Sequence, residues 1–529
     1  MHIHPHRTHR ILAGISLIAM TAATPALARS HHHGGSAALQ AAILAETQKM
    51  LDAQHAEFQQ EEAQKQAQID ALQAQVSALT TQLASTRTEV ASAPRPPAAA
   101  DIVAALPKPD TTVAMKNGTA TIASSDGAFS VALHGVFQLD AATYDQSKSL
   151  DAAVAGRDLN SGTNFRRARI GLNGKLYKDF DYNILLDFGG AGAEDVGRFH
   201  EAWIQYSGFR PAKIRIGEFA PLAGLADAGS ANASPFLERA SAAEIARNFA
   251  GGDTRMGIAA FNATDRYLWS LAVTGNTVSQ LNTQAPGFTA ANSDEQLGFV
   301  ARFAGTPLKG KTWLVHAGVN YSAVINPADA GGAAATRYPV QLRDRPELRV
   351  DGTRLIDTGA LNARSAAAGG VELGWQSGPF FAEGEAFRYD IKRLAPASGI
   401  TDPSFSGGYI EGGWSLTGET RKYNTQTAAF DGVTPRVNFD PAGGDWGAFE
   451  LVGRYSTVDL DYHADAVLAA DRVRGGRQDI TSLGLDWQLN PAIRFVIEGQ
   501  SVRIDRLSAT GVQIGQKYNS LSVRSQFGF

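Results

Sequence analysis

The chain has 529 residues, a formal net charge of −4 and no cysteine, which excludes disulfide frameworks, cysteine-ligated zinc and thiol catalysis. Its mildly acidic balance gives no indication of nucleic-acid binding, and at this length several domains or one large closed structure are expected. Beyond the N-terminus no run of 18 apolar residues could cross a bilayer as a helix, although a β-barrel can cross one with alternating residues and average hydropathy.

Residues 1–28 have the features of a secretory signal peptide. Arg7 and Arg10 form a basic start, Ile11 to Ala23 is a short apolar stretch, and Ala26-Leu27-Ala28 is a cleavage site of small residues. We therefore expect export. Loss of the two arginines would take the net charge of the mature chain from −4 to −6.

Residues 29–90 are predicted to form an α-helical coiled coil, because Ala38 to Val90 contains neither glycine nor proline and carries apolar residues at heptad spacing. The first series is Leu44, Leu51, Phe58, Leu72 and Leu79, and the second is Ile69, Val76, Leu83 and Val90. The alternative is a lone amphipathic helix that packs on the main domain. The following residues 91–117 are rich in proline and alanine and are predicted to be a semi-rigid linker.

Residues 118–529 change to a two-residue period. The segments Phe180–Phe188 and Trp313–Tyr321 alternate apolar and small or polar residues, and aromatic residues stand at both ends of the apolar face. Soluble sandwiches also alternate, but aromatic ends and a polar opposite face favour an outer-membrane barrel with a wet lumen. At about 10 residues per strand plus loops, we expect about 16 antiparallel strands in an all-β transmembrane barrel.

The chain ends on Phe529, with Phe527 on the same face, which is the usual end of a bacterial outer-membrane barrel. We interpret these two residues as an assembly signal. The expected partners are outer-membrane lipid and lipopolysaccharide, the barrel-assembly machinery, other copies of this chain and small anionic solutes. The expected location is the bacterial outer membrane, with the coiled coil in the periplasm.

Several segments together resemble the phosphate-selective porin family, the porin O and P group of outer-membrane channels. These segments are Phe165–Phe188, Ile214–Phe219, Ser234–Arg239, Leu416–Tyr423, Gly447–Ser456 and Leu483–Pro491. The resemblance implies a 16-stranded homotrimeric channel with an anion-attracting interior and a constriction loop folded inward. It also implies that lumen arginines and lysines draw phosphate or polyphosphate toward a narrow central zone.

Alternation within the strands predicts which cations point into the lumen. They are Arg167, Arg169, Lys213, Arg215, Arg302 and Arg454. An arginine that faced lipid at mid-membrane would cost about 2–4 kcal/mol, whereas a guanidinium group in the lumen can donate two parallel hydrogen bonds to an oxyanion. The alternative is that these arginines pair with lumen carboxylates and only stiffen the wall.

The segment Glu218–Asn248 is too long for a hairpin loop and is predicted to fold into the lumen as a constriction loop, with Arg239 and Arg247 as its cations. A surface loop that caps the barrel is the alternative. We expect passive diffusion of small anions, namely phosphate, pyrophosphate or polyphosphate. A general or carbohydrate-type porin, or a coiled-coil tether anchored by the barrel, is also open.

No enzymatic activity is predicted. The sequence contains neither a G-x-S-x-G nor an H-E-x-x-H motif, and the histidines of the barrel region are dispersed over different strands. No cofactor or metal is therefore expected.

Overall fold

The computed structural model divides into two compact units, Met1–Leu106 and Pro107–Phe529. The described residues are 36–92, 110–116, 119–146, 158–190, 197–249, 252–277, 294–331 and 335–529. The predicted signal peptide (1–28) and most of the predicted linker (91–117) lie outside them. The predicted domain boundaries stay predictions.

The first unit contains one long helix, α1 (Ser36–Ser92), of 57 residues. Its sequence is rich in alanine and glutamine and lacks glycine and proline, which favours the helix. The helix prediction is confirmed, whereas its assembly into a coiled coil stays a prediction. Five apolar seam residues are 46–70% exposed: Ile69, Leu72, Val76, Leu79 and Leu83. Within the described part of the chain, no helix is both long and apolar enough to span a membrane.

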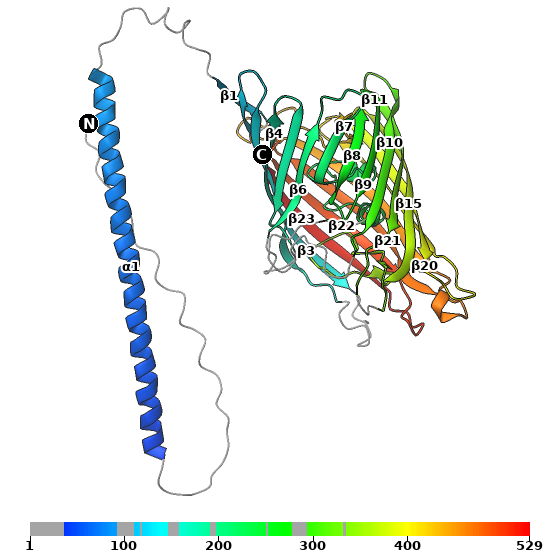
Figure 1. Cartoon of the computed structure of the whole chain (residues 1–529), viewed down its shortest axis with the longest axis horizontal. Coiled ribbons are helices and arrows are strands. Elements are labelled where there is room, and N and C mark those ends of the chain that lie inside the picture. Colours follow the sequence, from blue (N-terminus) through cyan, green and yellow to red (C-terminus); the bar gives the residue numbers. More distant parts are fainter. Residues whose placement is uncertain are drawn as a thin grey trace, which may run out of the picture. The chain divides into compact units, whose positions relative to one another are not determined.

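The second unit is a closed barrel of 16 antiparallel strands (Figure 1). The strands are β3 (Ser130–Gln146), β4 (Gly162–Leu176), β5 (Phe180–Asp187), β6 (Arg198–Tyr206), β7 (Lys213–Phe219), β8 (Arg255–Ala263), β9 (Tyr267–Thr274), β10 (Leu297–Lys309), β11 (Trp313–Asn326), β15 (Leu361–Ser377), β16 (Phe380–Arg393), β17 (Ser404–Ser415), β20 (Ala448–Tyr462), β21 (Val473–Gln488), β22 (Ile493–Asp505) and β23 (Gln516–Gly528). The last strand, β23, pairs with β3 and closes the cylinder. The predicted fold class and strand number are confirmed.

Shorter elements lie at the ends of the barrel and in its loops. A hairpin of β1 (Thr111–Lys116) and β2 (Thr119–Ser124) extends the sheet beside β3. The loop elements are α3 (Leu225–Ala228), α4 (Ser241–Asn248), β12 (Pro339–Val340), β13 (Arg343–Asp344), β14 (Ile356–Asp357), β18 (Tyr423–Asn424), β19 (Ala429–Phe430) and η2 (Ala469–Asp471).

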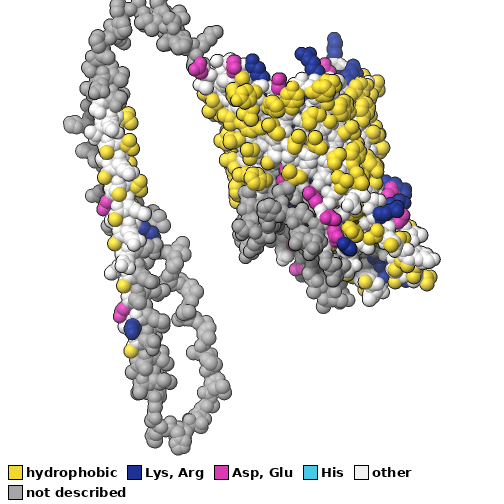
Figure 2. Space-filling model, in the orientation of Figure 1, with side chains coloured by type: hydrophobic (Ala, Val, Ile, Leu, Met, Phe, Trp, Pro, Cys, Tyr) yellow, Lys and Arg dark blue, Asp and Glu magenta, His cyan; other side chains and the backbone are white. Residues whose placement is uncertain are grey.

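The outer face of the barrel is apolar, as the alternation predicts. Figure 2 shows a broad band of hydrophobic side chains around the visible face of this unit, with charged groups gathered toward its two ends. Trp313 at the start of β11 and Tyr321 within it are both exposed, as are Phe180 and Phe188 around β5. Because β11 continues to Asn326, Tyr321 does not mark the end of the strand, contrary to the expectation from the sequence. Outward apolar residues and inward polar ones fit a lipid-facing wall around a polar interior.

The chain end completes the closure. Phe529 exchanges two backbone hydrogen bonds with Gly135 of β3, of 2.9 and 3.1 Å. The ring of Phe527 stacks on Phe137 with centroids 4.7 Å apart. A side chain at Gly135 would collide with the Phe529 ring, because a Cβ there would lie 2.9 Å from it. The missing side chain of Gly135 therefore makes room for the terminal aromatic ring.

The described residues of three loops fold into the interior, and we name them insert A (220–249 and 252–254), insert B (327–331 and 335–360) and insert C (416–447). Insert A joins β7 to β8 and carries α3 and α4, and α4 packs against β16, β17 and β20. Insert B joins β11 to β15, and insert C joins β17 to β20. Insert C enters from the opposite end of the barrel to inserts A and B, because successive strand connections alternate between the ends.

Candidate functional site

A β-bulge in β4 brings two consecutive arginines to the interior. The pairing of β3 with β4 shifts between Gln138 and Leu139, which oppose Arg167 and Phe165 and leave Arg166 as the extra residue. Such an insertion breaks strict alternation. Phe165 still faces outward, whereas Arg166 and Arg167 both reach Glu238 of insert A. Alternation alone predicted only Arg167 in this position.

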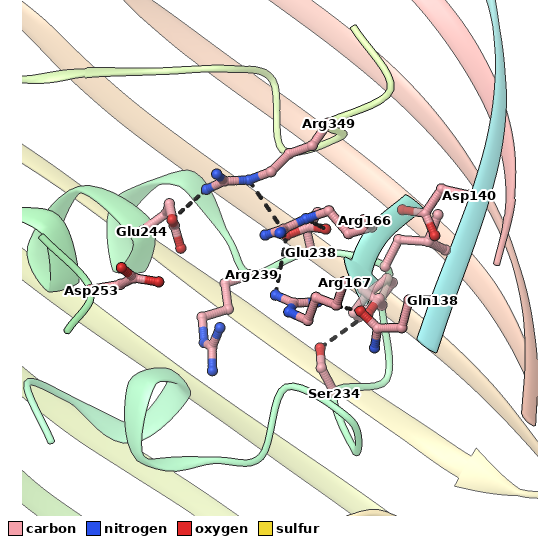
Figure 3. Close-up of polar contacts among 12 residues, drawn as sticks. Gln138, Asp140, Arg166, Arg167, Ser234, Glu238, Arg239, Glu244, Asp253 and Arg349 are labelled. Atoms are coloured by element: carbon pink, nitrogen blue, oxygen red, sulfur yellow. Dashed lines mark hydrogen bonds and ion pairs between the residues drawn. The ribbon is translucent and has the colours of Figure 1, made fainter. Parts of the chain in front are cut away.

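Glu238 is the centre of an arginine cluster (Figure 3). Its carboxylate lies 2.6 Å from Arg166, 3.9 Å from Arg167, 2.9 Å from Arg524 and 3.6 Å from Arg349. Burial opposes its ionisation, but the surrounding guanidinium groups outweigh burial and hold the pKa of Glu238 well below its usual value. One insert carboxylate thus organises four arginines from the wall and from insert B.

Besides Arg167, three more of the predicted lumen arginines are engaged by carboxylates. Arg169 lies 2.7 Å from Asp187, and Arg302 lies 2.8 Å from Glu372. Arg454 binds Glu347 of insert B and lies 3.5 Å from Glu411. Wall pairing, the alternative left open by the sequence, is therefore the geometry at these positions. Their part in an anion pathway stays a prediction.

Lys213 and Arg215 have no carboxylate in ion-pair range among the described residues. Arg215 donates to Gln205 through Nε and Nη2 at 3.1 and 2.8 Å, and its guanidinium group lies over the rings of Trp203 and Phe261. Lys213 donates to Gln426 of insert C at 3.2 Å. Both side chains keep N–H groups that bond to no other described residue, and their part in an anion pathway stays a prediction.

The two cations predicted for the constriction loop differ in their surroundings. Arg247 is buried and lies 2.8 Å from Asp227, 3.5 Å from Glu244 and 3.4 Å from Asp253, so its charge is compensated inside the loop. Arg239 donates instead to the backbone oxygens of Ala226 and Gly229, at 2.7 and 3.2 Å. It lines a cavity of about 30 Å³ between insert A and the wall.

Many other inward charges hold the inserts by their backbone. Glu385 accepts the N–H groups of Leu225 and Ala226 at 2.7 and 2.9 Å, and Glu498 accepts that of Leu237 at 2.8 Å. Arginines donate to insert carbonyls in the same way: Arg454 to Glu238, Arg494 to Asn232, and Arg302 to Thr427 and Ala428. A loop inside a protein needs such partners, because unpaired buried backbone groups are costly.

Insert B carries arginines that the sequence analysis missed. Arg343, Arg345 and Arg354 form no ion pair within the described residues, and Arg343 and Arg354 are exposed. Burial, together with repulsion from Arg349 and Arg354, lowers the pKa of Arg345 to about 10, so it remains charged at neutral pH. Of the nearby acids, Asp344, Glu347 and Asp351 are buried. The sequence feature that could have revealed these residues is the high density of arginine between positions 337 and 354.

Two larger cavities lie beside the inserts. One of about 220 Å³ includes Lys213 and Arg215, and one of about 380 Å³ lies near the chain end and includes Arg494 and Lys422. Across the described ranges there is no group of three or more His, Cys, Asp or Glu side chains that could hold a metal ion.

The sequence model of the family described as "Phosphate-selective porin O and P" matches residues 130–529, which is nearly the whole barrel. The chain belongs to the porin O and P family. Porin O of Pseudomonas aeruginosa strain PAO1 is 27% identical over 422 residues, covering 75% of this chain and 88% of that protein. An uncharacterized protein of Caulobacter vibrioides is 27% identical over 410 residues, covering 76% and 75%. Membership of this porin family places the barrel in the bacterial outer membrane.

Solved porin structures resemble the chain at much lower identity. The anion-selective porin from Comamonas acidovorans is 14% identical with a TM-score of 0.43, and the comparison covers 76% of this chain and 100% of that one. OmpT, an outer membrane protein of Vibrio cholerae, is 9% identical with a TM-score of 0.44, covering 76% and 98%.

Proposed function

We propose that the protein is a channel, not an enzyme, for passive diffusion of small anions, with phosphate, pyrophosphate or polyphosphate as solutes. Family membership supports a porin, and the family's description as phosphate-selective supports phosphate-type solutes. Guanidinium groups suit these solutes because their planar fork matches oxyanions.

The observation that carries anion preference is the arrangement of charge in insert B. Exposed Arg343 and Arg354 stand without ion-pair partners among the described residues, and three nearby carboxylates are buried. Exposed Arg337, by contrast, pairs with Asp329 at 2.9 Å. Unpaired charge on a loop inside a barrel concentrates counter-ions and excludes ions of like charge. Lys213, Arg215 and Arg239 would continue this path deeper in the lumen, where they also lack carboxylate ion pairs within the described residues.

The test is the reversal potential of the mature protein in planar bilayers under a salt gradient. We expect anion selectivity, and we expect the double substitution Arg345→Gln and Arg354→Gln to reduce it, because insert B loses two positive charges. Arg503→Gln is the matched control, because Arg503 is exposed on β22 and paired with Asp505 at 2.8 Å. Cation selectivity of the unaltered channel would contradict the proposal.

Phosphate preference needs its own measurement. A lumen that binds phosphate selectively should lose more chloride current to added phosphate than to sulfate at the same concentration. Equal effects of the two anions would leave a general anion channel.

The carbohydrate alternative receives less support from the aromatic residues. Phe381 packs against Phe236 of insert A, and the Tyr389 hydroxyl donates to Ala242 of the same insert at 2.6 Å. Rings engaged in this way cannot serve as a track for sugars.

We further propose that the periplasmic helix α1 assembles with its counterparts from other copies, in a homotrimer as the family resemblance implies. Support comes from the exposed apolar seam between Ile69 and Leu83, whose heptad spacing suits a coiled coil. Tethering to the cell wall is the remaining alternative for this helix.

A further inference from the structure

The cavity beside β7 combines two kinds of wall. It has a volume of about 220 Å³ and lies where β7 and β8 meet the start of insert A and part of insert C. Lys213 and Arg215 line one part, and Phe219, Leu222 and Phe261 line another. This volume is below the roughly 300–1,000 Å³ of sites for drug-sized ligands, so it suits a small molecule.

The polar wall has unused donors. Arg215 uses two of its five N–H groups, both on Gln205, and stacking between Trp203 and Phe261 fixes its plane. The two nearest acids are already engaged: Glu201 accepts from Asn183 and Trp203, each at 2.8 Å, and Asp181 pairs with Lys175 at 2.7 Å. The carboxylate of a ligand in the cavity would therefore lie beside the unused N–H groups of Arg215, whose orientation is fixed by stacking, and beside the Lys213 ammonium group.

The apolar wall distinguishes among anions. Phe219 is almost fully buried and packs with Ala259, and Phe261 packs against the same cluster. Phosphate has no apolar part to place there, so contact with these rings would cost it hydration and bury no apolar surface in return. An anion with a ring-sized apolar body would bury that body at about 25 cal/mol per Å².

We propose that this cavity is a binding site for small monocarboxylates that carry an apolar, ring-sized body. Arg215 and Lys213 hold the carboxylate, and Phe219, Phe261 and Leu222 contact the body. The inference deepens the proposed anion channel and rests on it, because the solute must reach the cavity through the lumen. It adds organic carboxylates to the inorganic oxyanions as solutes.

The experiment measures block of chloride current through single channels of the full mature protein at neutral pH. Benzoate supplies both charge and ring, formate supplies only the carboxylate, and benzamide supplies only the ring. We expect benzoate to block at about tenfold lower concentration than formate, and benzamide not to block. Equal block by benzoate and formate would overturn the proposal.

Two substitutions assign the parts of the site. Arg215→Gln should weaken block by benzoate about tenfold, because a charge-assisted hydrogen bond is lost. Phe261→Ser should weaken block by benzoate while leaving block by formate unchanged. Because Phe261→Ser could impair folding, Leu222→Asn provides a second change of the apolar wall. Leu222 has a φ of 59°, a conformation that asparagine tolerates.

The control is Arg503→Gln, which should leave benzoate block unchanged. Unaltered benzoate block in Arg215→Gln would overturn the assignment to this cavity. A channel that is anion-selective but shows no preference for benzoate contradicts this inference alone, whereas a cation-selective channel contradicts the proposed function.

Discussion

Arg169 illustrates what a charge inside this barrel contributes. It lies 2.7 Å from Asp187, and both side chains are largely buried. Removing one partner of a buried pair leaves the other charged and unsolvated, which typically costs about 3–5 kcal/mol. The same change alters the electrostatic potential of the lumen, because the remaining carboxylate repels anions.

We therefore expect the double substitution Arg167→Ala and Arg169→Ala to reduce anion permeability and to lower the free energy of unfolding. Reversal potentials report the first effect, and urea unfolding in detergent reports the second. Adding Asp187→Ala to the double variant should restore part of the anion permeability and part of the free energy of unfolding. Selectivity that stays unchanged in the double variant would remove these arginines from the anion pathway.

Asp344 of insert B gives a pH-dependent contribution. It is buried, and burial, opposed by Arg349 and reinforced by Glu244, raises the pKa of Asp344 from 3.8 to about 7. The folded protein therefore favours the protonated form. The stability that protonated Asp344 contributes is complete below the pKa of this side chain in the unfolded chain. It declines as pH rises from about 4 and is lost above about 7.

Asp344→Asn should accordingly raise the thermal unfolding temperature at pH 8 but leave it nearly unchanged at pH 4. The free energy of unfolding at pH 8 should rise by on the order of 1–4 kcal/mol, since one pKa unit corresponds to about 1.4 kcal/mol. Thermal unfolding by circular dichroism in detergent measures the difference. A gain of equal size at both pH values would indicate a packing effect instead.

At the scale of elements, the helix α1 carries an apolar seam that suits contact with other helices. Leu72 and Leu79 are each 60% exposed, and they lie on the same seam as Val76. Burying these side chains against other copies would provide the driving force for assembly.

Replacing Leu72 and Leu79 by Glu should therefore weaken association of the separate copies while leaving barrel folding intact. Sedimentation of the detergent-solubilised protein at several concentrations measures the association. The matched control is Ala74→Glu with Thr81→Glu, which adds the same charge on the opposite face of the helix. Equal oligomer distributions in both variants would contradict a role for this seam.

Strands and their faces could be predicted from the sequence because side-chain alternation is a local property. The outward positions of Trp313 and Tyr321 and the inward positions of Arg302 and Arg454 follow from parity alone. The bulge at Arg166 could not be predicted, since one extra residue leaves no local signature. Pairing between Glu385 and the backbone of Leu225 joins residues 160 positions apart, which no periodicity records.

Insert B shows a different reason for a missed site. Its arginines stand in a loop whose described strands have only two residues each, too few for a period of two or a heptad to assign a direction to a side chain. Their density was visible in the sequence, but only the fold separates exposed Arg354 from buried Asp351.

At the scale of the whole molecule, closure depends on the last residues of the chain. Phe529 bonds to Gly135 in both directions, and β23 completes the sheet against β3. An open barrel would leave unpaired backbone groups at two strand edges, which lipid cannot satisfy.

Deleting Phe529 should therefore lower the yield of folded barrel severalfold, because two backbone bonds and the ring contact with Gly135 are lost. The heat-dependent shift in gel mobility of refolded samples measures the folded fraction. Phe303→Ala, which removes an exposed aromatic side chain from mid-strand, is the control. Equal yields for the deletion and the intact chain would contradict the predicted assembly signal.

Some lumen arginines donate hydrogen bonds to the backbone of an insert, and others do not. This difference bears on how such proteins diversify. A change at Arg302 or Arg494 removes a backbone contact along with a charge, so it disturbs packing. Changes at Arg345 or Arg354 remove no such contact among the described residues, whereas a change at Arg215 removes its stacking on Trp203 and Phe261 but no insert backbone contact. A related channel can therefore change its solute preference by exchanging a few of these side chains, while the barrel and its inserts keep their fold.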